Sequence, residues 1–387
     1  MTTRISKYYR IGFVAMLGIL LLLLIILPKS AFSYVENRKL QHELTLSWKS
    51  ILDKSFSSQS EQFVSDQFPW REQWVSFKAL AEQARGMTVN NGILLGKQHY
   101  LFEAMKEPDW GEVEQYVDIV NQFINKFPQL HSTLLLAPTS VELYPQLLPA
   151  YASSYSQADT ADYIKQRFTD EATFIDAIAL FQPLAETEKP IYYRNDHHWN
   201  SYGAYYAYAA YMKTLNIQPL ALEQFEATTV STTFRGSYHT KGQFYGTVPD
   251  TIERYDSGYI TSKVTIHDDG STMNDLYAPS FLAEKDQYNY FLGGVHALMT
   301  IDNELTDQAL EAGHSFSIDS MLIIKDSYAH ALIPFLSQHV KTLYVIDPRY
   351  YNGSLEQYVN EHKIDELLLM YNIPTFVTER SLVNLKY

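Results

Sequence analysis

The sequence contains no cysteine among its 387 residues. Disulfides, thiolate nucleophiles, cysteine-based zinc sites and iron–sulfur clusters are therefore excluded, and the fold must be stable without covalent cross-links. Basic residues are also scarce beside acidic ones, with 30 Lys and Arg against 44 Asp and Glu and a formal net charge of -14. Because nucleic-acid binding needs clustered Lys and Arg to neutralise phosphates, this balance argues against a nucleic-acid partner.

Several recurring sequence patterns are also missing. There is no glycine-rich phosphate-binding loop, no dinucleotide fingerprint, no internal repeat and no low-complexity tract. Hydrophobic residues make up 46% of the chain and charged residues 19%, which permits a packed core. The 30 Tyr and 20 Phe suit an ordinary core and equally suit a surface that stacks on sugar rings.

One long apolar run lies near the N-terminus, from Ile11 to Pro28. It is long enough to cross a bilayer, and the basic residues before it (Arg4, Lys7, Arg10) predict a cytoplasmic N-terminus. Ala31-Phe32-Ser33 also fits a signal-peptide cleavage site. Since the run is longer than a typical signal-peptide core, we favour an uncleaved signal-anchor. Residues 1–28 are therefore predicted to form a cytoplasmic tip and one membrane span, with the remainder of the chain extracytoplasmic.

Composition shifts divide the exported part. Residues 29–105 are expected to form a mostly helical juxtamembrane region, broken at Pro69 because proline disfavours helix in the residue before it. From residue 106 to 387 the pattern is that of an α/β domain. Within it, residues 223–311 are rich in short strands and glycine-punctuated loops, which suggests an insertion or a β-rich flap.

The last segment gives the clearest pattern. Apolar runs at 320–324, 342–346 and 366–370 predict strands, separated by helices at 329–339 and 355–362. Strands this apolar are typical of a parallel sheet covered on both faces. In such sheets, ligands bind at the carboxyl ends of the strands.

Polar side chains follow each of these strands: Ser327, with its neighbours Lys325, Asp326 and Tyr328, then Arg349, then Asn372. A serine at a strand-to-helix turn is exposed as a nucleophile, and the helix N-terminal amides can hold an oxyanion. Asn372 could supply a further amide N–H. Ser327 alone could equally be a helix cap.

A serine nucleophile needs a base that is oriented by an acid. The segment Asp196-His197-His198-Trp199 offers such a pair before a predicted helix, with His198 as base and Asp196 as its orienter. The same three polar residues could instead form a metal-ligand set. Asn200 or Ser201 is expected to cap the helix that follows.

At Asp196-His197-His198-Trp199 the sequence resembles the DHHW family of bacterial exported proteins, which is named after this motif. Companion segments match in order along nearly the whole chain after the anchor: Glu36-Asn37-Arg38; Asp66, Phe68-Pro69 and Arg71; Pro138-Thr139-Ser140 with Tyr144-Pro145; Lys325-Asp326-Ser327-Tyr328; Asp347 with Arg349-Tyr350-Tyr351; and Tyr371-Asn372.

That family is similar to the SGNH-hydrolase-like alginate O-acetyltransferases. The resemblance implies a flavodoxin-type parallel sheet in permuted order, with Asp196 and His198 as acid and base and Ser327 as nucleophile. Asn372 takes the place of an oxyanion asparagine. Arg349, Tyr328 and His197 are candidate substrate-binding residues, and His197 is an alternative base. Lys325 stands where the usual motif has glycine, so the oxyanion hole departs from the pattern.

The implied activity is O-acyl, chiefly acetyl, transfer to a cell-envelope or exopolysaccharide, with no cofactor and no metal. Because acetyl-CoA is cytosolic, the resemblance also implies a multispanning membrane acyltransferase as donor partner. The alternatives are a polysaccharide acetylesterase with the same triad, a non-enzymatic glycan-binding or assembly protein, and a metal-dependent hydrolase.

Overall fold

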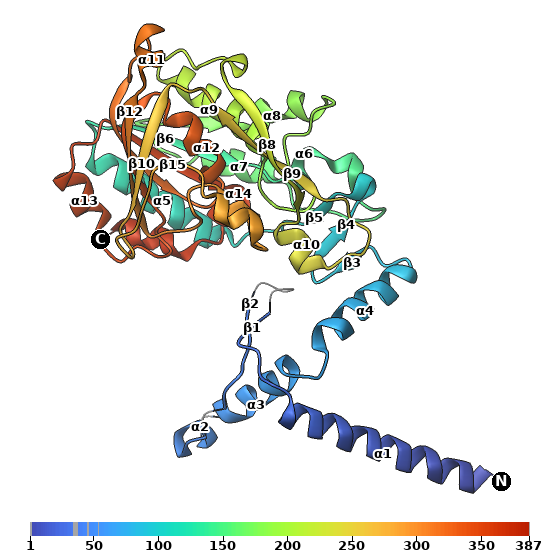
Figure 1. Cartoon of the computed structure of the whole chain (residues 1–387). Helices are drawn as coiled ribbons and strands as arrows, with labels where there is room; N and C mark the ends of the chain where they lie inside the picture. The colour runs from blue at the N-terminus through green and yellow to red at the C-terminus, as the bar shows by residue number, and fades with distance from the viewer. Residues whose placement is uncertain (1, 34–37, 45, 53, 387) are drawn as a thin grey trace. The chain divides into compact units, whose positions relative to one another are not determined.

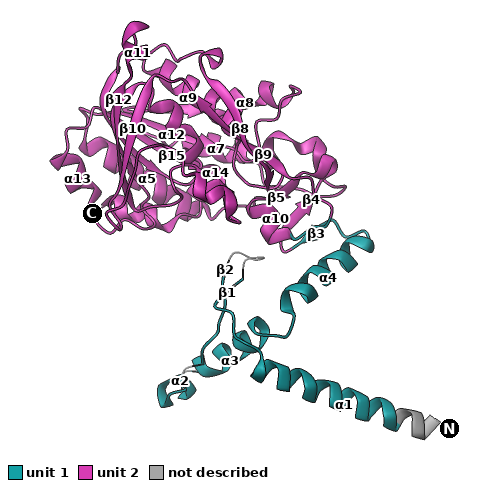
Figure 2. Cartoon of the chain, in the orientation of Figure 1, with its two compact units in different colours: residues 1–90, 243–245 teal, residues 91–242, 246–387 magenta. Residues whose placement is uncertain are grey.

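The computed structural model (Figure 1) describes residues 2–33, 38–44, 46–52 and 54–386. Glu36 and Asn37 of the juxtamembrane motif lie outside these described residues. Two compact units divide the chain, one formed by residues 1–90 and 243–245 and the other by 91–242 and 246–387 (Figure 2). The domain boundaries proposed at residues 28 and 105 remain predictions, because compactness alone does not define a domain.

The first unit begins with α1 (Thr2–Ile26), whose segment Lys7–Ile26 is long and apolar enough to cross a membrane. The short antiparallel pair β1 (Phe32–Ser33) and β2 (Arg38–Lys39) follows. Three helices, α2 (Trp48–Leu52), α3 (Ser55–Asp66) and α4 (Arg71–Ala84), and the short strand β3 (Val89–Asn90) come after it. The break between α3 and α4 falls around Pro69, as predicted, whereas a mostly helical region 29–105 stays a prediction.

The second unit contains an eight-stranded sheet of order β11-β10-β12-β14-β13-β15-β6-β7. Its strands are β6 (His131–Ala137), β7 (Thr173–Asp176), β10 (Ile260–Ile266), β11 (Thr272–Met273), β12 (Leu298–Leu305), β13 (Ile318–Lys325), β14 (Val340–Ile346) and β15 (Glu366–Asn372). The five strands from β14 to β7 are parallel, and β10, β11 and β12 run antiparallel at one edge. The three strands predicted from the apolar runs at 320–324, 342–346 and 366–370 are present as β13, β14 and β15.

The parallel strands have the flavodoxin order in a permuted chain. If β13 is counted as the first strand, then β14, β15, β6 and β7 follow as second to fifth, and their spatial order becomes 2-1-3-4-5. The fourth and fifth strands come first in the sequence. The permuted, doubly wound α/β sheet predicted from the sequence is therefore confirmed.

Helices cover both faces of this sheet because β13 is apolar on both sides. Met321 and Ile323 belong to one hydrophobic core with α8 (Ala177–Ala185), α9 (Ser201–Thr214) and α12 (Ala329–Leu336). Leu322 and Ile324 belong to a second core with α5 (Trp110–Lys126), α7 (Gln157–Lys165) and α13 (Leu355–Glu361). These two cores fix β13 at the centre of the unit.

The region 223–311 is strand- and loop-rich, and its description as an insertion or flap stays a prediction. It supplies β10, β11 and β12 of the sheet and a separate antiparallel ribbon of β8 (Glu226–Phe234) and β9 (Asp250–Asp256). The short helix α10 (Ser237–Gly242) lies between the two ribbon strands in the sequence. A second hairpin, β4 (Ile93–Leu95) with β5 (Leu101–Glu103), also belongs to this unit.

Candidate active site

Ser327 lies two residues after the end of β13, and Asn372 is the last residue of the adjacent strand β15. The chain leaves β13 through α12 on one face of the sheet and reaches β15 through α13 on the other. This reversal makes the gap between the two strand ends the switch point at which ligands bind in open α/β sheets. Both residues therefore sit where the sequence placed them.

The Asp196–Trp199 segment reaches the same place from the start of α9. Asn200 caps α9 by accepting a hydrogen bond from the Gly203 N–H at 2.9 Å, as predicted. The indole N–H of Trp199 donates to the backbone carbonyl of Tyr328 at 3.0 Å, and the Tyr328 hydroxyl donates to the backbone carbonyl of His197. These two bonds join the segment to the turn that carries Ser327. Tyr328 is fully buried, so it supports the turn rather than facing a substrate.

Asp196, His198 and Ser327 form a continuous chain of short contacts. The Nδ1 of His198 lies 2.5 Å from Asp196 Oδ1, and the Nε2 of His198 lies 2.8 Å from Ser327 Oγ. An ionised carboxylate only accepts hydrogen bonds, so Nδ1 carries the ring proton and Nε2 is left to accept the proton of the serine hydroxyl. This is the arrangement that activates a serine.

Asp196 is buried and strongly held as a carboxylate. The backbone N–H groups of His198 and Ser237 donate to its two oxygens at 2.9 and 2.7 Å. Burial alone would raise the pKa of Asp196, but His198, His197 and these hydrogen bonds outweigh it and hold the pKa well below its usual range. A side chain at Gly236 would collide with this carboxylate, since a Cβ there would lie 2.1 Å from Asp196 Oδ2.

An aromatic ring completes the environment of the base. The Tyr288 ring stacks on the His198 ring with centroids 3.8 Å apart and planes 8° apart. Such a ring face stabilises an imidazolium, which forms when His198 takes up a proton. Tyr288, Gly236 and Ser237 were not found by sequence reasoning, because they lie in the strand- and loop-rich region without a motif. The spaced glycines of this region, which include Gly236, were the available sign of a close backbone approach.

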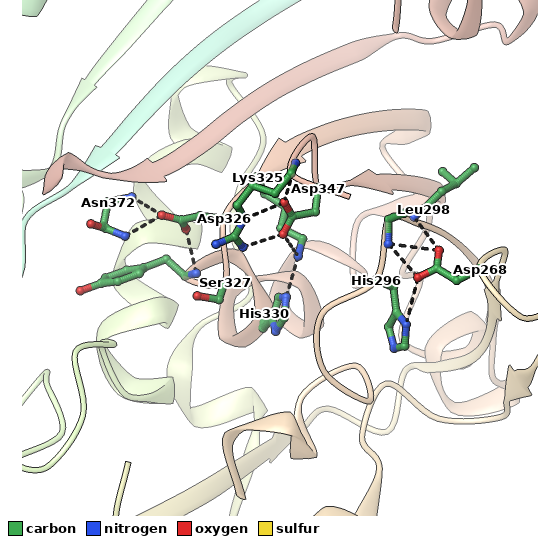
Figure 3. A network of polar contacts seen from close by, with 12 residues as sticks. Asp268, His296, Leu298, Lys325, Asp326, Ser327, His330, Asp347 and Asn372 are labelled. Carbon is green, nitrogen blue, oxygen red and sulfur yellow. Dashed lines mark hydrogen bonds and ion pairs between the residues drawn. The ribbon is translucent and has the colours of Figure 1, made fainter. Parts of the chain in front are cut away.

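Asn372 donates hydrogen bonds to Asp326, the residue before Ser327. Its backbone N–H and its side-chain amide both donate to Asp326 Oδ2, at 2.8 and 2.6 Å (Figure 3). The amide also donates to Thr375 Oγ1 at 2.7 Å. In this arrangement every N–H of Asn372 is used, so its oxyanion role stays a prediction that requires one of these bonds to open. Among the described residues, the backbone N–H of Ser327 has no hydrogen-bond acceptor.

Lys325 belongs to a buried network of charged side chains beside the turn that carries Ser327 (Figure 3). Its Nζ lies 2.7 Å from His330 Nε2 and 3.4 Å from Asp347 Oδ2, and it is fully buried. Arg349 donates to both oxygens of Asp347, at 2.9 and 2.7 Å. Burial lowers the pKa of Lys325 despite the attraction of Asp347. Arg349, a candidate substrate-binding residue, is thus held by Asp347.

His197 points to a different partner from His198. Its Nδ1 lies 2.6 Å from Ser237 Oγ, and burial together with the neighbouring His198 lowers its pKa to about 4. Ligand atoms of Asp196, His197 and His198 lie within 4.8 Å of one another, as a metal site would require. Both ring nitrogens of His198 already contact Asp196 and Ser327, so a metal would have to displace one of them. The geometry favours proton transfer over metal binding at these residues.

Comparisons with known proteins agree with this fold. A family model described as DHHW protein matches residues 113–346, which is more than half of the chain. A search of curated proteins finds no match. A DHHW family protein from Eubacterium siraeum DSM 15702 is similar in structure with a TM-score of 0.65 at 21% identity, over 77% of this chain and 96% of that chain.

Two further solved structures are similar. Bacillus cereus PatB1 with a sulfonyl adduct has a TM-score of 0.60 at 18% identity, over 73% of this chain and 95% of that chain. The O-acetyltransferase domain of Pseudomonas putida AlgJ has a TM-score of 0.47 at 14% identity, over 76% of this chain and 98% of that chain. At these identities, the likeness to the Eubacterium siraeum protein and to PatB1 establishes a shared fold.

Proposed function

This chain belongs to the DHHW family, and we propose that it transfers acyl groups, chiefly acetyl, to a polysaccharide outside the cytoplasmic membrane through an acyl-Ser327 intermediate. One observation carries the proposal: the hydrogen-bonded order Asp196, His198, Ser327 at the switch point of the sheet. The PatB1 structure, which has the same fold, contains a sulfonyl adduct.

In the first half-reaction, His198 Nε2 takes the proton of Ser327 Oγ as the oxygen attacks the acyl carbonyl carbon. The carbonyl oxygen becomes an oxyanion, for which the free N–H of Ser327 is the available donor. The protonated His198 then gives its proton to the departing donor oxygen, and an ester on Ser327 remains. Asp196 stabilises the imidazolium throughout and stays ionised.

In the second half-reaction, a polysaccharide hydroxyl loses its proton to His198 and attacks the same carbonyl carbon. The bond to Ser327 Oγ breaks, the serine recovers its proton from His198, and the acyl group leaves on the sugar. No cofactor enters either step. The apolar helix Lys7–Ile26 supports anchoring in the cell membrane, where a multispanning membrane acyltransferase would present acetyl groups from the cytosol.

If water replaces the sugar as acceptor, the same residues make an acetylesterase. The third possibility, a non-enzymatic glycan-binding or assembly protein, requires no contact between His198 and Ser327, and their 2.8 Å contact favours an enzyme.

The test is the release of acetate from a chromogenic nitrophenyl acetate by the full chain in detergent micelles. We expect Ser327→Ala to lower the rate by about 10³-fold or more while the far-UV circular dichroism spectrum is unchanged. A Ser327→Ala chain with native activity would rule out the mechanism. Supplying a polysaccharide then separates the two activities, because a transferase acetylates it and an esterase releases only acetate.

A further inference from the structure

A cleft of about 650 Å³ opens beside the catalytic residues in the second unit. His197, Ser237 and Asn372 lie in its wall. Ser237 binds Asp196 and His197 precedes His198, so each is one step from the triad. Asn372 is two steps away, because it binds Asp326, the residue before Ser327. The cleft therefore adjoins the triad, although Asp196, His198 and Ser327 are not themselves among its lining residues.

The charges around the cleft are unequal. Four carboxylates line it (Glu103, Glu107, Asp109, Glu112) against two lysines (Lys106, Lys241), and no arginine is among its described lining residues. The side chain of Lys241 forms an ion pair with Glu103, so these two charges cancel. Lys106 then faces three carboxylates, and the cleft is net negative.

Apolar side chains form the rest of the wall. Met105 and Pro108 come from the loop before α5, and Pro374 and Val377 come from the end of the chain after β15. Such groups pack against the C–H faces of sugar rings, while the carboxylates accept hydrogen bonds from hydroxyl and ammonium groups.

We propose that this cleft binds the acceptor glycan and selects one without acidic groups, preferring an amino-bearing chain over a neutral one and a neutral one over a polyuronate. The inference rests on the proposed acyl transfer and names its acceptor class. A uronate carboxylate in the cleft would face Glu107, Asp109 and Glu112 with a single unpaired lysine for compensation, and like charges in contact are unfavourable. A protonated amine would instead be attracted by the same carboxylates.

Binding of three matched ligands tests this without requiring catalysis. Cello-oligosaccharides, their glucosamine counterparts and their glucuronic acid counterparts share one β-1,4-linked backbone. They differ by one substituent on each ring, a C2 amine or a C6 carboxylate, and hence in charge. Titration into the full-length Ser327→Ala chain, in a non-ionic detergent that contains no sugar, should give the tightest binding for the amine series. The glucuronic acid series should bind weakest, each step being roughly three- to fivefold. Added salt should shrink the differences because it screens the charges.

A paired set of variants locates the effect. Glu107→Gln combined with Glu112→Gln removes two charges from the cleft and should bring the three series to nearly equal affinity. Asp118→Asn removes one exposed charge from the same helix α5 outside the cleft, and should leave the order unchanged.

Equal affinities in the unaltered cleft, tighter binding of the glucuronic acid series, or binding of none of the three would overturn the acceptor assignment. Those results would leave the Ser327 mechanism standing. Loss of that mechanism would instead show as nitrophenyl acetate hydrolysis that is independent of Ser327.

Discussion

The Nε2 of His198 lies 2.8 Å from the Oγ of Ser327, although 129 positions of the sequence separate the two residues. The serine is fixed by a strand at the centre of the sheet, and the histidine by a loop before α9. Tyr328 and Trp199 join the two through hydrogen bonds to backbone carbonyls. The contact between His198 and Ser327 is thus a product of the tertiary fold. Substitutions that disturb it should lower the rate of acyl transfer.

The same substitution at the two adjacent histidines should lower the rate to very different extents. His198→Gln removes the base and should lower acetate release by about 10³-fold or more. His197→Gln removes a ring whose Nδ1 contacts Ser237 Oγ, and should lower the rate by less than about tenfold. Initial rates of nitrophenyl acetate hydrolysis measure both. Greater loss in His197→Gln would identify His197 as the base.

Gly236 should tolerate no side chain. Its Cβ would lie 2.1 Å from Asp196 Oδ2 and 2.4 Å from Asp196 Cβ, so Gly236→Ala must displace the carboxylate. We expect a loss of about 1–3 kcal/mol in the free energy of unfolding and a large fall in kcat. The control is Ser237→Ala, which keeps the backbone N–H that binds Asp196 and should retain most activity. Equal behaviour of the two variants would contradict this role.

The Tyr288 ring should matter more than its hydroxyl. Tyr288→Phe keeps the stacking on His198 and removes a hydroxyl that makes a 3.4 Å contact to the Ser327 carbonyl and also interacts with the backbone of Ala331. We expect kcat to stay within about twofold of native. Tyr288→Ala removes the ring face that stabilises the imidazolium, and kcat should fall by roughly fivefold to thirtyfold. Steady-state kinetics of the two variants test this. A Phe variant as impaired as the Ala variant would assign the effect to the hydroxyl.

Acid should destabilise the chain partly through His339. Burial and the nearby His314 lower the pKa of His339 to about 4, and its Nε2 lies 2.7 Å from the Tyr208 hydroxyl. In the unfolded chain a histidine has a pKa of about 6.5. Between these values the unfolded state binds a proton that the folded state does not, so stability is lost as pH falls from about 6.5 to about 4.

His339→Gln removes this contribution. Urea unfolding at a series of pH values should show that native stability falls more steeply than that of the variant, by up to about 1.4 kcal/mol per pH unit. Parallel pH profiles would show that His339 does not titrate abnormally in the folded chain.

The sequence predicted those parts of the molecule in which chemistry or periodicity is local. The strands β13, β14 and β15 are apolar because both sheet faces are covered, so their runs were visible. Asp196 and His198 were recognisable because an acid two residues before a histidine can orient its ring. Ser327 was recognisable because it follows a predicted strand. The break between α3 and α4 around Pro69 followed from the local preference of proline.

The remainder depends on contacts between distant segments. Tyr288 reaches His198 from a loop that has no periodic pattern, and Gly236 is required only because Asp196 approaches it in space. The burial of Lys325 between His330 and Asp347 could not be anticipated, since lysine is ordinarily a surface residue. The hydrogen bond from Asn372 to Asp326 likewise forms only because the ends of two strands are adjacent in the sheet.

The central claim is that Ser327 carries the acyl group, and trapping that group tests it most directly. The full chain in detergent micelles is mixed with an acetyl ester, quenched in acid within seconds, digested and analysed by peptide mass spectrometry. The account predicts an acetyl group on Ser327 in the native chain and none on this peptide in Ser327→Ala or His198→Ala. Turnover of the ester without acetylated Ser327, or with the acetyl group on another residue whose loss abolishes turnover, would contradict it.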